Sequence, residues 1–145
     1  MPIVKFQKLR SWAKMPKYAT AKASGADLFS VEKVSIGPGG TKLVSTGIRI
    51  ELPEGYEAQI RSKGGLATKG IFVVNSPGTI DNDYRGELKV ILHNLPGNRG
   101  IQTLERGDKI AQLVISPIIF ATFEETEEVS TDTGRGEGAF GSTGR

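Results

Sequence analysis

The sequence predicts an all-β fold, either a sandwich or a barrel. Short stretches rich in β-branched and aromatic residues recur at intervals of about 8–12 residues, which is typical of such folds. Glycine (19 residues) and proline (7 residues) stand between these stretches and mark tight turns. Helical periodicity is nearly absent, because only residues 64–70 have room for a turn or two of helix.

Six strands are expected along the chain. The second alternates apolar and polar side chains at Ile48, Ile50 and Leu52, so one of its faces is buried. The last is a long β-branched run in which Pro117 indicates a bulge or a break. The expected strands are residues 3–6, 42–52, 56–62, 71–74, 87–94 and 109–120.

The 145 residues correspond to about one domain. The chain has no cysteine, no apolar run near the ~20 residues of a membrane helix and no N-terminal apolar stretch like a signal peptide, so we expect a cytoplasmic protein without a membrane partner. The net charge is +3, but the basic residues are scattered, and we do not expect a nucleic-acid partner.

The composition changes near the C-terminus. Residues 124–145 are first acidic and then rich in glycine, serine and threonine, with Phe140 as their one aromatic side chain. Such a segment does not fold alone, so we expect a β domain over residues 1–123 followed by a flexible arm. Arg135 and Phe140 suit a lid that orders on a ligand.

Several kinds of catalytic site are excluded. His93 is the only histidine, which argues against a Ser-His-Asp arrangement or a histidine metal cluster, and its apolar strand favours a structural role. The chain has no P-loop motif. Aspartates beside glycine turns remain, together with glycine-rich loops whose backbone N–H groups suit phosphate oxygens.

Five stretches carry a resemblance to a known family. In order they read ASGADLFS, RSKGGLATKG, NSPGTIDNDYRGELKV, RGDKIAQL and RGEGAFGSTG, at residues 23–30, 61–70, 75–90, 106–113 and 135–144. Their order and spacing resemble the five motifs of the trimeric deoxyuridine triphosphatases, the dUTPases, over nearly the whole chain. The third and fifth motifs are the most specific.

The resemblance implies a jelly-roll-like, distorted β-barrel that forms a homotrimer. It also implies hydrolysis of dUTP to dUMP and pyrophosphate with Mg²⁺, which keeps uracil out of DNA and supplies dUMP for dTMP synthesis. Each active site would lie between subunits and use residues from all three chains.

The resemblance also assigns roles to residues of the third motif. Asp81 matches the general base that activates the attacking water, and Tyr84 matches the tyrosine that packs on deoxyribose. The positions that match uracil-reading groups are Asn75, Thr79, Ile80 and Lys89.

The other motifs match positions around the phosphates. Asp27 of the first motif corresponds to an acid that acts on the metal indirectly, through water. Gln112 lies near the phosphates, Arg135 reaches the γ-phosphate and Phe140 stacks over uracil. The remaining substrate-binding positions are Ser62, Lys63, Gly64, Gly65, Gly141 and Ser142.

The second motif departs from the family pattern. The family reads Pro-Arg-Ser-Gly-Leu-Ala where this chain has Ser62, Lys63 and Gly64 before Gly65. Lysine lacks the bidentate fork of arginine, and a lost transition-state hydrogen bond costs roughly 10²–10³ in rate. We therefore expect intact recognition and reduced turnover. Two alternatives stay open: a nucleotide-binding regulatory protein with weakened catalysis, and dCTP deaminase, which shares the fold.

Overall fold

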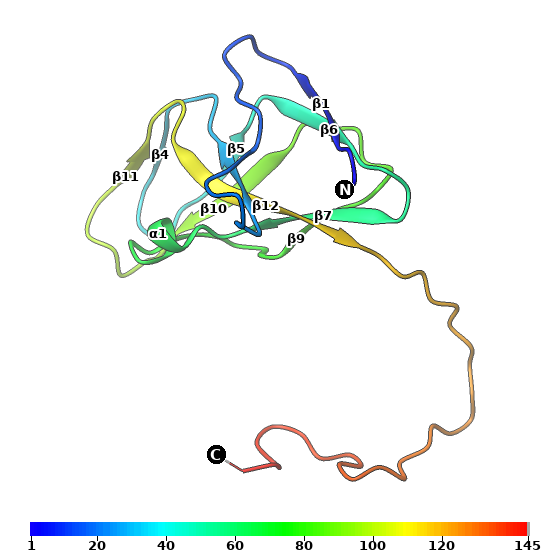
Figure 1. Ribbon diagram of the computed structural model, residues 1–145. Helices are drawn as coiled ribbons and strands as arrows, with labels where there is room; N and C mark the ends of the chain where they lie inside the picture. The colour runs from blue at the N-terminus through cyan, green and yellow to red at the C-terminus, as the bar shows by residue number, and fades with distance from the viewer. Residues whose placement is uncertain (145) are drawn as a thin grey trace.

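The computed structural model describes residues 1–144 and confirms an all-β body (Figure 1). Its one helix, α1 (Gly64–Ala67), has the length expected for that segment. The strands are β1 (Lys5–Lys8), β2 (Lys17–Tyr18), β3 (Ala26–Phe29), β4 (Val34–Ile36), β5 (Thr41–Ser45), β6 (Ile48–Glu51), β7 (Tyr56–Arg61), β8 (Ile71–Val73), β9 (Gly78–Ile80), β10 (Lys89–Asn94), β11 (Gln102–Leu104) and β12 (Lys109–Pro117).

The strands form four antiparallel sheets, with most neighbours far apart in the sequence. The largest sheet has the order β2-β3-β12-β7-β9, and a second has the order β5-β10-β8. Two-stranded pairs β1-β6 and β11-β4 complete the body. Figure 1 shows these sheets wrapped around one interior, in agreement with the jelly-roll-like barrel.

The core follows the two-residue period of the strands. Ile48 and Ile50 of β6 are buried while the residue between them is exposed, and Val90 and Leu92 of β10 are buried with a partly exposed residue between them. Burying alternate apolar side chains from facing sheets supplies most of the stabilisation of such a fold.

The expected strands are present with altered limits. The first begins at Lys5 rather than at residue 3. The run at residues 42–52 divides into β5 and β6, because Gly47 takes a positive φ of 69° and packs against Val31. β12 ends at Pro117. Five short strands, β2, β3, β4, β9 and β11, were not predicted, because their two to four residues do not form an apolar run or a clear alternation.

The five-stranded sheet has one polar face. Across β2, β3, β12 and β7, cross-strand partners place Lys17 opposite Asp27, Asp27 opposite Gln112, and Gln112 opposite Arg61. Directly opposite residues in a sheet point to the same side. This row therefore gathers side chains of the first, second and fourth motifs on one surface.

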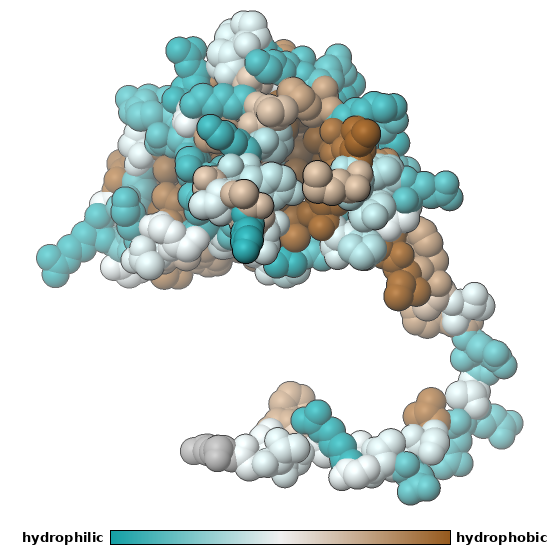
Figure 2. Space-filling model, in the orientation of Figure 1, coloured by the Kyte–Doolittle hydropathy of each residue, from teal (hydrophilic) through white to brown (hydrophobic). Residues whose placement is uncertain are grey.

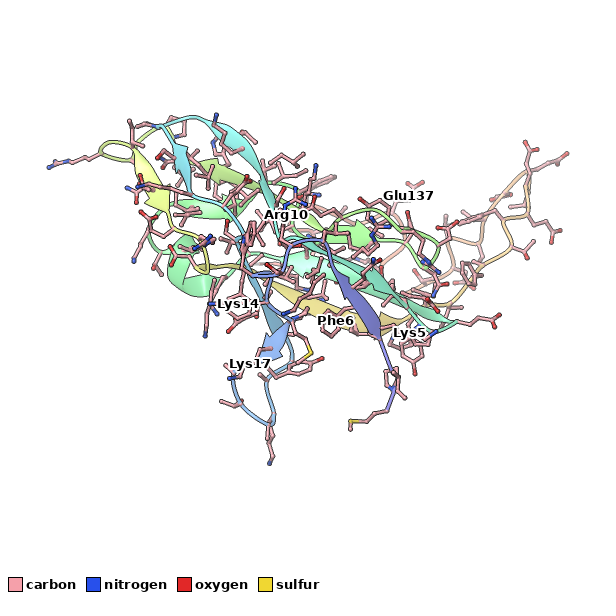
Figure 3. All side chains as sticks on the ribbon, turned by 90° about the horizontal axis from the view of Figure 1, so that it is seen from above. Lys5, Phe6, Arg10, Lys14, Lys17 and Glu137 are labelled. Carbon is pink, nitrogen blue, oxygen red and sulfur yellow. The ribbon has the colours of Figure 1, made fainter. Side chains whose placement is uncertain are left out.

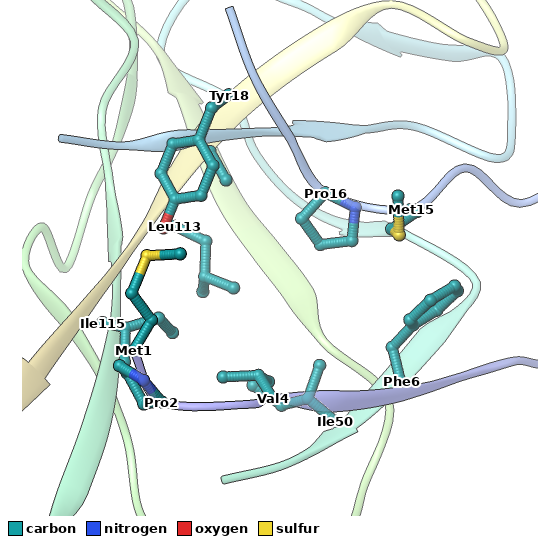
Figure 4. A pocket seen from close by; sticks show the side chains of 11 residues that line it. Met1, Pro2, Val4, Phe6, Met15, Pro16, Tyr18, Ile50, Leu113 and Ile115 are labelled. Atoms are coloured by element: carbon teal, nitrogen blue, oxygen red, sulfur yellow. The ribbon is translucent and has the colours of Figure 1, made fainter. Parts of the chain in front are cut away.

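The opposite face of the same sheet is apolar. A cavity of about 370 Å³ lies there, and its lining includes Val4, Phe6, Ile50, Leu113 and Ile115 (Figure 4). These side chains offer no group for acid–base or phosphate chemistry.

No helix within residues 1–144 is long and apolar enough to cross a membrane.

The C-terminal segment leaves the body after β12. Ile118 still donates its N–H to the carbonyl of Gly55 at 2.9 Å, and the following chain runs away from the sheets (Figure 1). Ile119 and Phe120 are exposed, and Figure 2 shows a hydrophobic cluster where the segment departs and a mostly hydrophilic surface beyond it. The expected flexibility of residues 124–145 stays a prediction.

Candidate active site

A buried aspartate organises one end of the candidate site. Asp27 of β3 is 4% exposed. Its Oδ1 lies 2.6 Å from Lys63 Nζ, and its Oδ2 lies 2.8 Å from Lys109 Nζ. Burial opposes ionisation of this carboxyl, but hydrogen bonds and charge attraction from the two lysines outweigh it and lower the pKa of Asp27. The carboxylate is therefore ionised at neutral pH and holds both ammonium groups in place.

The loop after β7 positions Lys63. The N–H of Ser62 donates to Ser76 Oγ at 3.1 Å, and the Oγ of Ser62 accepts the N–H of Val73 at 2.9 Å. Gln112 Nε2 donates to the Ser62 carbonyl at 3.1 Å. These bonds tie the second motif to the third and fourth motifs, so the loop is held from two sides.

Gly25 lets the first motif approach Gln112 closely. A Cβ on Gly25 would lie 2.5 Å from Gln112 Oε1, a distance that side chains do not tolerate. Asp27 lies opposite Gln112 in the β3–β12 pairing and holds Lys63 through the ion pair. We call these three residues the phosphate-side cluster.

The glycines of the second motif begin α1. A Cβ added at Gly64 or Gly65 would meet no heavy atom within 4 Å, and neither residue has a positive φ. Their backbone N–H groups belong to the first helical turn, where no intrahelical acceptor exists. The hydroxyl oxygen of Ser62 accepts a hydrogen bond from the N–H of Val73. Ser62 lies two positions before the position at which the family has its serine. Backbone amides are thus the groups that this loop offers at position 64.

The third motif forms a turn between β9 and β10. Tyr84 donates its N–H to the Asp81 carbonyl at 3.1 Å and its hydroxyl to the Glu87 carbonyl at 2.9 Å. Gly86 has no side chain, which leaves room for the Tyr84 ring. Asn82 Nδ2 donates to the carbonyls of Pro53 and Tyr56, and this anchors the turn to the body.

Asp81 borders an open pocket of about 690 Å³. Glu57, Asn82 and Asp83 line it as well, together with the apolar residues that begin the C-terminal segment. Asp81 and Tyr84 are exposed, so a ligand can reach both. Asn75 packs against Gly78 at the other end of β9, with 3.0 Å between its Nδ2 and the place of a Cβ. We call Asn75, Thr79, Ile80, Asp81 and Tyr84 the hairpin cluster.

Lys89 lies at the start of β10, opposite Ser45 of β5. Its backbone is therefore part of a strand that adjoins the hairpin turn. His93 of the same strand bonds Thr41 Oγ1 at 2.9 Å and meets the Phe72 ring edge-on, in agreement with a structural role.

The fifth motif lies apart from the body within one chain. Arg135 Nε donates to the Gly138 carbonyl at 2.9 Å, and Phe140 is fully exposed with a φ of 50°. Figure 1 shows residues 135–144 separated from the sheets. Gly141 also has a positive φ, of 94°, whereas Ala139 does not, so alanine at position 139 is compatible with this conformation.

Within one chain, the three groups of predicted residues do not share one pocket. Gln112 pairs with Arg61 at one end of β7, whereas Ile80, next to Asp81, pairs with Ala58 nearer the other end. A strand rises about 3.3 Å per residue, so the phosphate-side cluster and Asp81 lie on the order of 10 Å apart along β7. The arm residues are separate from both.

Lys109 is the functional candidate that the motifs did not single out. It lies three residues before Gln112, and a register shift between Lys109 and Ala111 in the β12–β3 pairing turns it towards Asp27. A lysine followed by an apolar run gives no signal of such a bulge. The ion pair between Lys109 and Asp27, which lies 82 positions earlier, was therefore visible only in three dimensions.

The carboxylates do not build a protein cage for a metal ion. In residues 1–144, no three His, Cys, Asp or Glu side chains gather closely enough to hold one. Both oxygens of Asp27 already face lysines. Mg²⁺ usually keeps several waters and binds through one or two carboxylates and substrate phosphates rather than through an all-protein cage.

Comparison with known proteins identifies similar chains. A sequence model of the dUTPase family matches residues 11–144. Deoxyuridine 5'-triphosphate nucleotidohydrolase of Hydrogenobaculum sp. is 57% identical over 140 residues, 95% of each chain. The enzyme of the same name from Anaplasma marginale is 50% identical over 133 residues, 90% of this chain and 88% of the relative.

Solved structures are similar over the same region. The dUTPase of Staphylococcus bacteriophage 80alpha, solved with dUpNHpp, has a TM-score of 0.89 and 27% identity, and the match covers 99% of both chains. A mutant dUTPase from phage phi11 of S. aureus, in which a structural Mg(II) ion is coordinated, has a TM-score of 0.79 and 26% identity over 88% of this chain and 98% of that one.

Proposed function

The chain belongs to the dUTPase family, and we propose that it hydrolyses dUTP to dUMP and pyrophosphate. The observation that carries this proposal is the hairpin cluster, which combines an exposed carboxylate, a fixed tyrosine and a strand edge in one turn. The relatives that are 50% and 57% identical to this chain are named for the same activity.

The hairpin cluster binds the nucleoside part of dUTP. The ring of Tyr84 is fixed by the bond from its hydroxyl to the Glu87 carbonyl, so it offers a rigid apolar face to the deoxyribose. A rigid face in this position leaves no room for a 2′-hydroxyl. Backbone groups at Thr79, Ile80 and Lys89, with the Asn75 amide, read the uracil edge. Buried hydrogen bonds reject cytosine because its edge would leave polar groups unpaired.

Asp81 acts as the general base. Its carboxylate borders the open pocket, so it can accept a proton from a water held in line with the α-phosphorus. The water oxygen then bonds to that phosphorus, the bond to the bridging oxygen of the β-phosphate breaks, and pyrophosphate leaves. A positioned base contributes typically about 10²–10⁴ to such a rate.

The phosphate-side cluster and the arm neutralise the triphosphate. Lys63 provides charge at one end, while the N–H groups of Gly64 and Gly65 supply donors without a side-chain hydroxyl. Arg135 reaches the terminal phosphate, and Phe140 covers the base. Closing the arm excludes water and strengthens every charge interaction within the site.

We infer that a complete site uses more than one copy of the chain. Asp81 lies on the order of 10 Å from the phosphate-side cluster along β7, and the fifth motif lies apart from both, although one bound dUTP must contact all three. A homotrimer in which each copy contributes one group satisfies this requirement. Ile119 and Phe120, which are exposed and line the Asp81 pocket, lie where the arm leaves the body.

Mg²⁺, when bound with the triphosphate, offsets its negative charge and orients the phosphates. The residues that would face this ion through water are Asp27 and its neighbours of the first motif. Because Lys63 and Lys109 hold Asp27 ionised, the carboxylate can accept hydrogen bonds from metal-bound waters on its remaining lone pairs.

The two alternative functions are not favoured by the comparisons, since the relatives carry the hydrolase name throughout. The deciding experiment measures pyrophosphate and ammonia release from dUTP, dCTP, dTTP and UTP with and without Mg²⁺. We expect pyrophosphate from dUTP alone, dependent on Mg²⁺. Ammonia from dCTP would indicate a deaminase, and tight dUTP binding without pyrophosphate would indicate a regulatory binding protein.

A further inference from the structure

A second pocket is lined by Asp27 but not by Lys63. Its volume is about 370 Å³, and its lining consists of Lys14, Lys17, Ala19, Asp27, Phe29 and Lys109. This volume lies within the range of small-ligand sites. None of the three lysines that line it belongs to the residues that the family motifs assign to substrate.

Three independent contacts direct the lysines to this pocket. Lys109 Nζ is held at 2.8 Å by Asp27 Oδ2. Lys17 lies directly opposite Asp27 in the β2–β3 pairing, on the same side of the sheet. Lys14 Nζ donates to the Gly107 carbonyl at 3.3 Å and lies 5.0 Å from the centre of the Phe29 ring. Figure 3 shows Lys14 and Lys17 projecting from the same edge of the body.

The charges of this pocket do not balance. Its lining carries three ammonium groups and one carboxylate, and that carboxylate also serves Lys63. Like charges gathered on one surface repel one another, although water and salt screen part of this repulsion because the three lysines are exposed. A ligand with two or more negative charges would relieve it, whereas a cation or a neutral molecule would not.

The pocket adjoins the proposed phosphate end of the active site. Lys63 and Lys109 contact the two oxygens of one carboxylate, so their ammonium groups lie within a few ångströms of each other. An anion released beside Lys63 therefore lies close to Lys109, and Lys14 and Lys17 line the same pocket as Lys109.

We propose that Lys14, Lys17 and Lys109 form a diphosphate-binding site continuous with the active site, which takes the pyrophosphate product as it leaves. The inference rests on the proposed hydrolysis of dUTP, because the reaction supplies the ligand. The same chemistry could come from the terminal diphosphate of bound dUTP, and the experiment separates the two sources.

The test compares wild type with Lys14→Gln, Lys17→Gln and the double variant. The control is Lys42→Gln, which removes an equally exposed lysine from β5, away from the pocket. Pyrophosphate is titrated into the nucleotide-free protein by calorimetry, and its inhibition of dUTP cleavage is measured separately. Lys17→Gln is the cleanest change, because it disturbs neither the Asp27 ion pairs nor the Phe29 contact.

We expect the pyrophosphate dissociation constant and its inhibition constant to rise about tenfold for each lysine removed, as for one lost charge-assisted contact. The KM for dUTP should change little. A tenfold rise in KM with unchanged pyrophosphate binding would overturn the product-site proposal and assign the lysines to bound substrate. Unchanged pyrophosphate binding with altered subunit association would overturn it in favour of an interface role.

If the proposed hydrolysis of dUTP is wrong, the measurements differ from those expected if only the pocket proposal is wrong. If the wild type cleaves no dUTP, the calorimetric titration still measures pyrophosphate binding to the lysines. Absence of binding to an active wild type refutes the pocket alone.

Discussion

Lys63 Nζ lies 2.6 Å from Asp27 Oδ1, so an ion pair joins the second motif to the first across 36 positions of sequence. Lys109 holds the other oxygen of the same carboxylate. One buried negative charge thus orders a loop lysine and a strand lysine, and the loss of the carboxylate would leave both cations without compensation.

The Asp27 ion pairs predict acid sensitivity. The folded state lowers the pKa of Asp27, so the carboxylate contributes stability above its unfolded pKa near ~3.9, and this stability is lost as the pH falls through the lower folded value. The free energy of unfolding of the wild type should therefore fall below about pH 4 more steeply than that of Asp27→Asn. Denaturant titrations between acidic and neutral pH measure both. Asp132→Asn, in the arm, controls for removal of one negative charge, and parallel pH curves for wild type and Asp27→Asn would refute the prediction.

Removing the general base should abolish turnover while substrate still binds. Asp81→Asn keeps the size of the side chain but cannot accept the proton of the attacking water, so we expect kcat to fall by about 10²–10⁴ with KM nearly unchanged. Steady-state pyrophosphate release measures both constants. Asp83→Asn, in the same pocket, removes the same charge and should retain most activity. A comparable loss in both variants would show that pocket charge, not proton transfer, is responsible.

Restoring a hydroxyl in the second motif should raise activity. A side chain at Gly64 meets no atom within 4 Å and requires no strained φ, so Gly64→Ser fits without rearrangement. An added transition-state donor is worth up to about 10²–10³ in kcat, and we expect a gain towards that range. Gly65→Ser adds the same group one position later, where the space is equally open, and should give no gain. Unchanged kcat for Gly64→Ser would mean that the backbone amides already suffice.

Mixed oligomers test whether the site is shared between chains. Asp81→Asn and Arg135→Ala should each be nearly inactive alone. If one active site uses Asp81 and Arg135 from different chains, oligomers assembled from both variants contain some sites with neither change, and activity returns. If both residues act within one chain, every site carries a change and no activity returns. Val129→Ala, an exposed arm residue, controls for arm substitution in general.

Gly70, in the turn that follows α1, should contribute to the free energy of unfolding without a role in catalysis. Gly70 takes a φ of 75°, and a Cβ there would collide with the Asn98 amide. Gly70→Ala should therefore lower the free energy of unfolding by about 1–3 kcal/mol, as strained positions do. Gly97→Ala, where a Cβ meets nothing within 4 Å, should change it little. Equal stabilities in a denaturant titration would contradict the role of Gly70.

The sequence alone determined the fold class and the order of the motifs. Alternation at Ile48 and Ile50 and the apolar runs at β8, β10 and β12 are local signals, because a strand with one buried face imposes its two-residue period on its own residues. The five stretches of motif were equally visible, since each is a continuous segment whose glycines and charges lie side by side in the chain.

Only the tertiary structure decided which residues meet. Asp27, Lys63 and Lys109 come together through strand pairing and a bulge, and neither leaves a mark in the residues near any one of them. The hydrogen bond between the Ser62 hydroxyl and the Val73 N–H likewise leaves no mark in the sequence. It forms because the loop around α1 folds back onto β8. Periodicity is set by each residue's own neighbours along the chain, whereas ion pairs between strands depend on register, and register is fixed by the packing of the whole body.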